Sequence, residues 1–211
     1  MARSFRSLWA IPLAVAAYVF FATFPHSQLV EGAETQINST VKVVLKDGHG
    51  SGVYIGNNEV LTAAHVALGE AGLVKVIAAD GKEKFATVVW LNMDYDLALL
   101  RIRGDVPETL LKSEVSCKTP AIGERIEAYG SPGANDFLTM KGYVAGGVTS
   151  KDKWKEVISA DLTILPGMSG GPVFNSKGEV AGISVGVALI YGGIVRIGFV
   201  VPGSTICKLM V

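Results

Sequence analysis

One serine set among glycines is the residue in this sequence that could most plainly do chemistry. Ser169 stands in LPGMSGGPVF, with Gly167 before it, Gly170 and Gly171 after it, and a proline on either side. Glycine loses more conformational freedom on folding than any other residue, so a glycine cluster marks an unusual turn or a close approach of the backbone. A serine held there could act as a nucleophile, provided that a base takes its proton.

The positions of the histidines limit where that base can come from. Residues 167–171 match the G-x-S-x-G elbow of the α/β-hydrolases, in which the histidine follows the serine. The three histidines here, His26, His49 and His65, all precede Ser169. The elbow is therefore rejected, and the order histidine, acid, serine is the one to test.

Two further motifs supply that order. His65 lies in EVLTAAHV, where a β-type run ends in small residues that leave room around an imidazole. Asp96 lies in DYDLALLRI, beside an apolar segment that can bury a carboxylate. Asp94 is the competing acid, but it stands two residues before the DLALL motif.

The segments LTAAHV, DLALL and GMSGGPVF, in this order, resemble the chymotrypsin-fold (trypsin-like) serine proteases. GSGVYIG before the histidine and RIGFVVPGSTI near the end are similar to the bacterial HtrA/Deg type. The resemblance implies an all-β fold of two six-stranded antiparallel β-barrels, about residues 37–104 and 118–203, within a protease domain of 37–211. The site would lie in the cleft between the barrels.

The patterning of the chain agrees with short strands. Val41, Val43 and Leu45 alternate with Lys42 and Lys46, which is the pattern of a half-buried strand. Turn signals such as DGHG, GNNE, ADGK and NSKG recur at short spacing, and no long segment has helical periodicity.

The resemblance assigns a role to each reactive group. Ser169 would attack a peptide carbonyl, His65 would take and return the proton, and Asp96 would hold the imidazole. The backbone N–H groups of Gly167 and Ser169 would form the oxyanion hole. Trypsin-like zymogens carry an aspartate just before the nucleophile; Met168 stands there, so activation through that aspartate is not expected.

The resemblance also implies a specificity. Thr163 would lie at the base of the primary substrate pocket, and the walls would come from Val185, Gly186 and Val187, with Ile164, Gly198 and Phe199. Their apolar character predicts a small or medium aliphatic residue before the scissile bond.

An apolar segment precedes the protease region. Residues 8–24 carry no charge and follow Arg3 and Arg6, so we expect residues 1–36 to be a hydrophobic helix that acts as a membrane anchor or signal segment. An A-x-A-like site directly after the run is missing, which favours an uncleaved anchor over a cleaved signal peptide. Either reading places the protease outside the cytoplasm, in the periplasm or the extracellular space. Because the chain stops at Val211, we expect no PDZ domain within it.

Composition excludes some partners. The 211 residues carry 19 Lys and Arg against 19 Asp and Glu, so the zero formal charge offers no basic footprint for nucleic acid. We expect a protein or peptide substrate, contact with a membrane through the N-terminal segment, no cofactor and no metal, since His49 has no neighbouring ligand. The oligomeric state stays open.

Two cysteines, Cys117 and Cys207, lie far apart in the sequence. An exported chain can oxidise them, and the resemblance brings their regions together, but two isolated thiols remain the alternative. The function predicted is that of a serine endopeptidase; a non-catalytic or partner-activated binding module of the same fold is the alternative.

Overall fold

The structure is a computed structural model, and it describes residues 34–68, 73–151, 153–190 and 195–210. These residues all belong to one compact unit. The predicted hydrophobic helix at 8–24 lies outside the described residues. Within the described ranges, no helix has the length and apolar character needed to cross a membrane.

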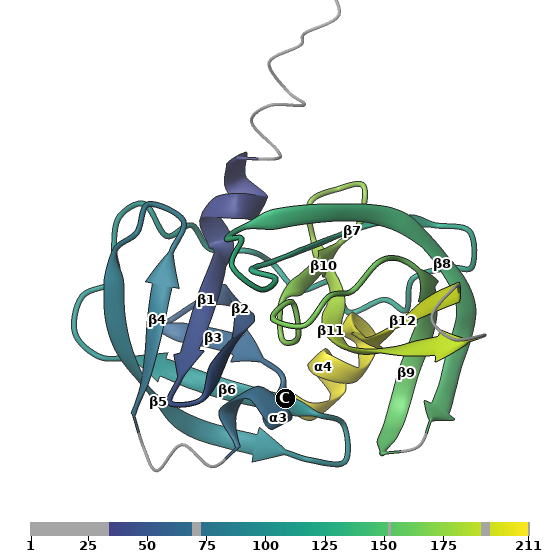
Figure 1. The fold of residues 1–211 in the computed structure, drawn as a ribbon, viewed down its shortest axis with the longest axis horizontal. Helices are drawn as coiled ribbons and strands as arrows, with labels where there is room; N and C mark the ends of the chain where they lie inside the picture. Colours follow the sequence, from purple (N-terminus) through teal and green to yellow (C-terminus); the bar gives the residue numbers. More distant parts are fainter. Residues whose placement is uncertain (1–33, 69–72, 152, 191–194, 211) are drawn as a thin grey trace, which may run out of the picture. The chain divides into compact units, whose positions relative to one another are not determined.

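The first half of the described chain forms a closed antiparallel barrel, coloured purple to teal in Figure 1. Around the barrel the strands follow the order β1-β2-β3-β6-β5-β4, and the last pairs with the first. Their bounds are Thr40–Leu45 for β1, Gly48–Gly56 for β2, Glu59–Thr62 for β3, Val74–Ala78 for β4, Glu83–Asn92 for β5 and Leu97–Ile102 for β6.

Local sequence explains how this barrel begins. The alternation at the start of β1 puts Val41 and Val43 in the core, fully buried. The turn between β2 and β3 has Asn57 and Asn58 at φ values of 51° and 62°. Asparagine tolerates this left-handed conformation, and two such residues give the turn the twist that an antiparallel hairpin needs. The predicted alternation and turn are therefore encoded within a few residues.

The second half forms another closed antiparallel barrel, green to yellow in Figure 1, with the order β10-β11-β12-β9-β8-β7. The strands are Arg125–Gly130 for β7, Leu138–Lys151 for β8, Trp154–Asp161 for β9, Pro172–Phe174 for β10, Val180–Ile190 for β11 and Val195–Pro202 for β12. The predicted class, two six-stranded antiparallel barrels of the chymotrypsin fold, is confirmed.

The apolar core connects the two barrels. One buried cluster contains Val43 and Leu100 from the first barrel together with Tyr129 and Phe174 from the second. The Tyr129 and Phe174 rings meet edge to face with centroids 5.3 Å apart. Because this apolar surface is shared, separating the barrels would expose it to water.

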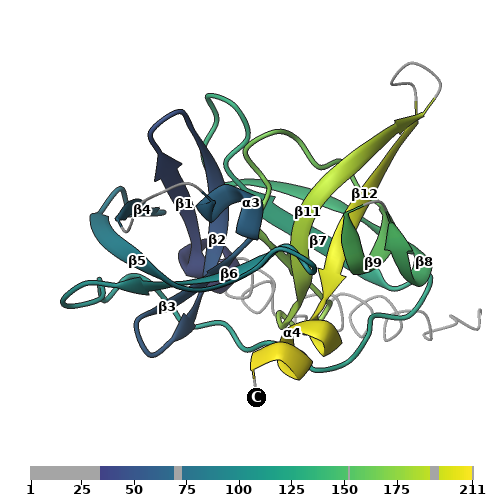
Figure 2. The same cartoon turned by 90° about the horizontal axis from the view of Figure 1, so that it is seen from below.

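Two short helices complete the fold. Helix α3, Ala64–Ala67, follows β3 directly, and helix α4, Gly203–Met210, follows β12. Figure 2 shows α4 at the lower edge of the molecule, and it packs against β11 and β12. Glu156 of β9 accepts hydrogen bonds from Thr205 and Lys208 of α4, at 2.6 and 2.9 Å.

The structure joins the two cysteines whose state the sequence left open. Cys117 and Cys207 form a disulfide with their Cα atoms 5.5 Å apart, and the bond ties the segment before the second barrel to α4. The residues it connects are 90 positions apart, so it constrains a long loop of the unfolded chain.

We predict that removing this bond lowers the free energy of unfolding by about 2–5 kcal/mol. The measurement is urea unfolding of the wild type with and without reductant, and of the double variant Cys117→Ala/Cys207→Ala. Reductant should weaken the wild type and leave the double variant unchanged. Equal stability of the oxidised and reduced wild type would contradict the prediction.

Candidate active site

The structure brings His65 and Asp96 into direct contact. His65 lies in α3 at the end of β3, and Asp96 lies in the turn between β5 and β6. Strand β6 pairs with β3, so the two residues come from neighbouring strands. His65 Nδ1 is 2.7 Å from Asp96 Oδ2, and the His65 backbone N–H donates to Oδ1 at 2.8 Å. The carboxylate therefore fixes both the backbone and the ring of the histidine.

The environment of Asp96 keeps its carboxyl group ionised. Burial raises the pKa of Asp96, but the hydrogen bonds from His65 and from Trp154 outweigh burial and hold the pKa below its ordinary value. An ionised carboxylate can only accept hydrogen bonds, so His65 Nδ1 must carry a proton. Nε2 of the neutral ring is then left with its lone pair, as a general base requires.

Ser169 lies in a loop of two consecutive tight turns. Met168 N donates to Leu165 O at 2.9 Å, and Gly171 N donates to Met168 O at 2.9 Å. The third residue of each turn is a glycine with positive φ, Gly167 at 97° and Gly170 at 84°. Type II turns require a positive φ at the third position, which glycine adopts without steric cost.

The turns also aim two backbone N–H groups. Across a trans peptide bond the C=O and the following N–H point in opposite directions. Pro166 O accepts from Gly133 N at 3.2 Å, so Gly167 N–H points away from Gly133. Met168 O accepts from the buried Ser184 Oγ at 2.7 Å, so the Ser169 N–H points away from that interior. Neither N–H donates to an acceptor among the described residues.

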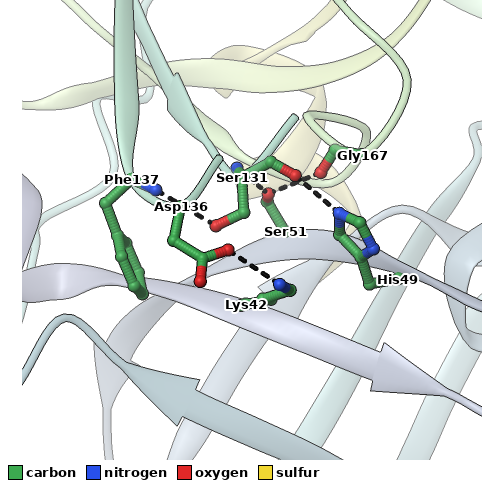
Figure 3. A network of polar contacts seen from close by, with 7 residues as sticks. All are labelled: Lys42, His49, Ser51, Ser131, Asp136, Phe137 and Gly167. Atoms are coloured by element: carbon green, nitrogen blue, oxygen red, sulfur yellow. Dashed lines mark hydrogen bonds and ion pairs between the residues drawn. The ribbon is translucent and has the colours of Figure 1, made fainter. Parts of the chain in front are cut away.

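One buried residue of the first barrel holds this loop. Ser51 of β2 donates from its backbone N–H to Ser169 O at 2.8 Å and from its Oγ to Gly167 O at 2.7 Å. The same Oγ accepts from Ser131 N at 3.0 Å. Figure 3 shows Ser51 between Ser131 and Gly167, with His49 Nε2 2.7 Å from Ser131 O.

A second link in this network lies at the surface. Lys42 of β1 forms an ion pair with Asp136 at 2.7 Å, and Phe137 N donates to Ser131 Oγ at 3.3 Å (Figure 3). The loop after β7 is thus joined to the first barrel at several points.

Close packing places Ser169 next to the histidine segment. A Cβ at Gly50 would lie 2.6 Å from the Val66 side chain and 2.9 Å from Ser169 O. A Cβ at Gly170 would press into Thr62 Oγ1, three residues before His65. Within the described part of the chain, Ser169 Oγ has no hydrogen-bond partner, and no hydrogen bond joins it to His65.

The residues predicted for the substrate pocket lie on two segments. Thr163 is exposed between the buried Leu162 and Ile164, in the segment after β9. On β11, Val185 is buried, whereas Gly186 and Val187 are partly exposed. Asp94, the competing acid, makes no hydrogen bond with His65 and instead forms an ion pair with Lys155.

Three contributors were missed by reasoning from the sequence. Ser51 lies in GSGVYIG, a segment noted only for its resemblance to the HtrA/Deg type, and His49 lies in DGHG, which predicts a turn. The lysines of SKDKWKE predict a solvated hairpin around Trp154. Trp154 Nε1 donates to Asp96 Oδ2 at 2.9 Å across the two barrels. A tryptophan flanked by lysines in SKDKWKE gives no periodic signal for such a contact; its one clue is that a large aromatic ring is rarely left in water.

The comparison with protein families decides where this chain belongs. The family described as "Trypsin-like peptidase domain" matches residues 50–183, which include His65, Asp96 and Ser169. The chain belongs to the trypsin-like peptidase family. A relative from Pseudomonas putida described as a probable periplasmic serine endoprotease, DegP-like, is 36% identical over 157 residues. The alignment covers 72% of this chain and 32% of the relative, so the chain spans about a third of that relative's length.

Solved structures agree with this assignment. The inactive form of the Rv3671c protease of M. tuberculosis is 25% identical with a TM-score of 0.73, and the match covers 87% of this chain and 94% of that one. The serine endoprotease from Yersinia pestis is 26% identical with a TM-score of 0.72, over 85% of this chain and 64% of that one. The HtrA-like resemblance seen in the sequence is confirmed at the level of the family.

Across residues 34–68, 73–151, 153–190 and 195–210, no group of three or more His, Cys, Asp or Glu side chains is arranged to hold a metal ion.

The crowding at Gly170 yields a prediction with a matched control. Gly81 has nearly the same φ, 81°, but nothing lies within 4 Å of the position of its absent Cβ. We expect Gly81→Ala to cost about 1–2 kcal/mol, the penalty of a left-handed alanine. Gly170→Ala should cost more than roughly 3 kcal/mol, because its Cβ would also press into Thr62 and Ser51. Urea unfolding measures both; similar losses would show that the loop yields easily.

Proposed function

We propose that this chain is a serine endopeptidase in which Ser169 is the nucleophile, His65 the general base and acid, and Asp96 the group that orients His65. The observation that carries the proposal is the His65–Asp96 pair at 2.7 Å, together with the loop that holds Ser169. In that loop the N–H groups of Gly167 and Ser169 have no acceptor among the described residues, and the hydrogen-bonded carbonyls of Pro166 and Met168 fix their direction. Membership of the trypsin-like peptidase family supports the same assignment.

The first half of the reaction would be the attack of Ser169 on the scissile peptide bond. Ser169 Oγ attacks the carbonyl carbon of the scissile peptide bond while His65 Nε2 takes the hydroxyl proton. The carbonyl oxygen becomes an oxyanion, which the N–H groups of Gly167 and Ser169 would stabilise. Asp96, ionised, offsets the positive charge that develops on the imidazole.

Collapse of that intermediate would complete the cleavage. His65 returns its proton to the leaving amine as the C–N bond breaks, which leaves an acyl ester on Ser169. Water then attacks the ester with His65 again as base, releases the carboxylic acid and restores the serine hydroxyl. No cofactor is needed to balance these steps.

The finer specificity rests on the predicted pocket. Thr163, Val185, Gly186 and Val187 present no acid to attract lysine or arginine, and we propose that a small or medium aliphatic residue precedes the scissile bond. Ile164 supports this, because it is buried and lies where a side chain at Gly198 would be, 2.8 Å from the absent Cβ.

The test uses the purified full-length protein with a fluorophosphonate probe and with unfolded casein. Ser169→Ala should abolish both labelling and cleavage, and Asp96→Asn should lower turnover by about 10⁴-fold, because the imidazole loses its orienting carboxylate. Ser176→Ala, at an exposed turn, is the matched control and should keep both activities.

The outcomes separate the proposal from its alternative. A folded wild type that neither labels nor cleaves would contradict it and favour a binding or partner-activated module of the same fold. If the wild type is active, sequencing the casein fragments tests the pocket, and cleavage mainly after lysine or arginine would overturn the aliphatic preference.

We also propose that the chain is exported, with residues 8–24 as its anchor or signal. The Cys117–Cys207 disulfide supports an oxidising compartment, and the relative from P. putida is described as periplasmic. We predict that alkaline phosphatase fused after Val211 is active in bacterial cells. A carbonate wash should leave the fusion in the membrane if the segment is uncleaved and release it if cleaved. An inactive fusion present at normal abundance would contradict export.

A further inference from the structure

We propose that Trp154 is a positioning residue for the reaction, holding the carboxylate of Asp96 through its indole N–H. This inference rests on the proposed function, since it assigns a partner to the acid of the triad. Trp154 Nε1 lies 2.9 Å from Asp96 Oδ2, the same oxygen that accepts from His65 Nδ1 at 2.7 Å. The contact joins residues 58 positions apart, one from each barrel.

The indole is suited to this task by its chemistry. The nitrogen of tryptophan donates and cannot accept, so its hydrogen bond has only one direction. Two donors on Oδ2 and the His65 backbone N–H on Oδ1 account for the orientation of the whole carboxylate. The buried Ser184 of β11 does not donate to Asp96, because its one hydroxyl proton is shared between Met168 O at 2.7 Å and Gly171 O at 3.2 Å.

The ring is itself held firmly. Trp154 is 7% exposed and packs against Phe199 with ring centroids 5.4 Å apart. A Cβ at Gly186 would lie 2.6 Å from its Cη2 atom, so the ring rests directly against β11. Lys153 Nζ lies 5.1 Å from the ring centroid. The donor is therefore fixed by the second barrel and not by the turn it contacts.

The turn around Asp96 needs an external support of this kind. Asp96 has a φ of 55°, and a residue in this conformation persists only where its surroundings enforce it. The neighbouring Lys155 N–H donates to Asp94 O at 2.8 Å, and its side chain pairs with the Asp94 carboxylate. The first two residues of β9 thus hold the acid turn at two points, by backbone and by side chain.

The experiment compares Trp154→Phe with Trp90→Phe in the full-length protein. Trp154→Phe keeps an aromatic ring in the packed site but removes the N–H. Trp90 is a half-buried tryptophan of β5 that makes no hydrogen bond to His65, Asp96 or Ser169. We expect Trp154→Phe to lower kcat about tenfold with little change in KM, the size expected when a charged group loses one hydrogen bond. Trp90→Phe should leave both unchanged.

The pH dependence of kcat/KM distinguishes this role from a purely structural one, because a loss of packing alone would not shift it. Without the indole donor the Asp96 carboxylate becomes a stronger hydrogen-bond acceptor, so it interacts more strongly with the protonated form of His65. The acidic limb of kcat/KM, and of the fluorophosphonate labelling rate, should shift to higher pH in Trp154→Phe. If that variant does not fold, benzothienylalanine at position 154 replaces only the N–H by sulfur and tests the same point.

Each outcome is decisive. An inactive wild type would overturn the proposed function and this inference with it. An active wild type whose Trp154 variant keeps the same kcat and the same acidic limb would overturn this inference alone. A variant that is less stable to heat but has an unmoved acidic limb would do so too, because it would assign Trp154 a purely structural role.

Discussion

The docking of the two barrels at Ser51 is the constraint on which the site depends. This one buried residue of the first barrel donates to Ser169 O and Gly167 O, accepts from Ser131 N, and accepts from Thr62 Oγ1 at its own carbonyl oxygen. A buried polar group without a partner costs about 1–3 kcal/mol, so a state in which only some of these hydrogen bonds are formed is unfavourable. Closing the barrels onto each other and shaping the serine loop are therefore one event, and neither barrel contains the site by itself.

The turn that carries Asp96 is also held by groups of the other barrel. The first barrel supplies Ser51 to the serine loop of the second, and the second supplies Trp154 and Lys155 to the acid turn of the first. Each reacting segment has glycines or an aspartate at positive φ, which is a conformation that needs support from outside the segment. A displacement of one barrel would therefore disturb the Ser169 loop and the Asp96 turn together.

The limits of the sequence follow from the range of each interaction. The fold class could be predicted because the order of three motifs is preserved and because strand alternation at Val41 and Val43 is a local property. The tight turns at 165–171 were also within reach, since Pro-Gly and Ser-Gly dipeptides mark turns. Trp154 could not be found this way, because its partner is 58 residues distant and a polar contact between barrels leaves no periodicity. Lysines on both sides made its hairpin resemble an ordinary solvated one.

The residue before Ser169 shows which kind of interaction shapes the loop. Met168 stands where trypsin-like zymogens have an aspartate, and its side chain is fully buried in the second barrel. An ion pair at that residue is therefore ruled out, and the loop is held by neutral hydrogen bonds from Ser51 and Ser184 to Gly167 O and Met168 O. Such bonds do not depend on the protonation of either partner. It follows that a regulator of this loop would have to act by moving the hydrogen-bonding groups, of which Ser51 belongs to the first barrel and Ser184 to the second.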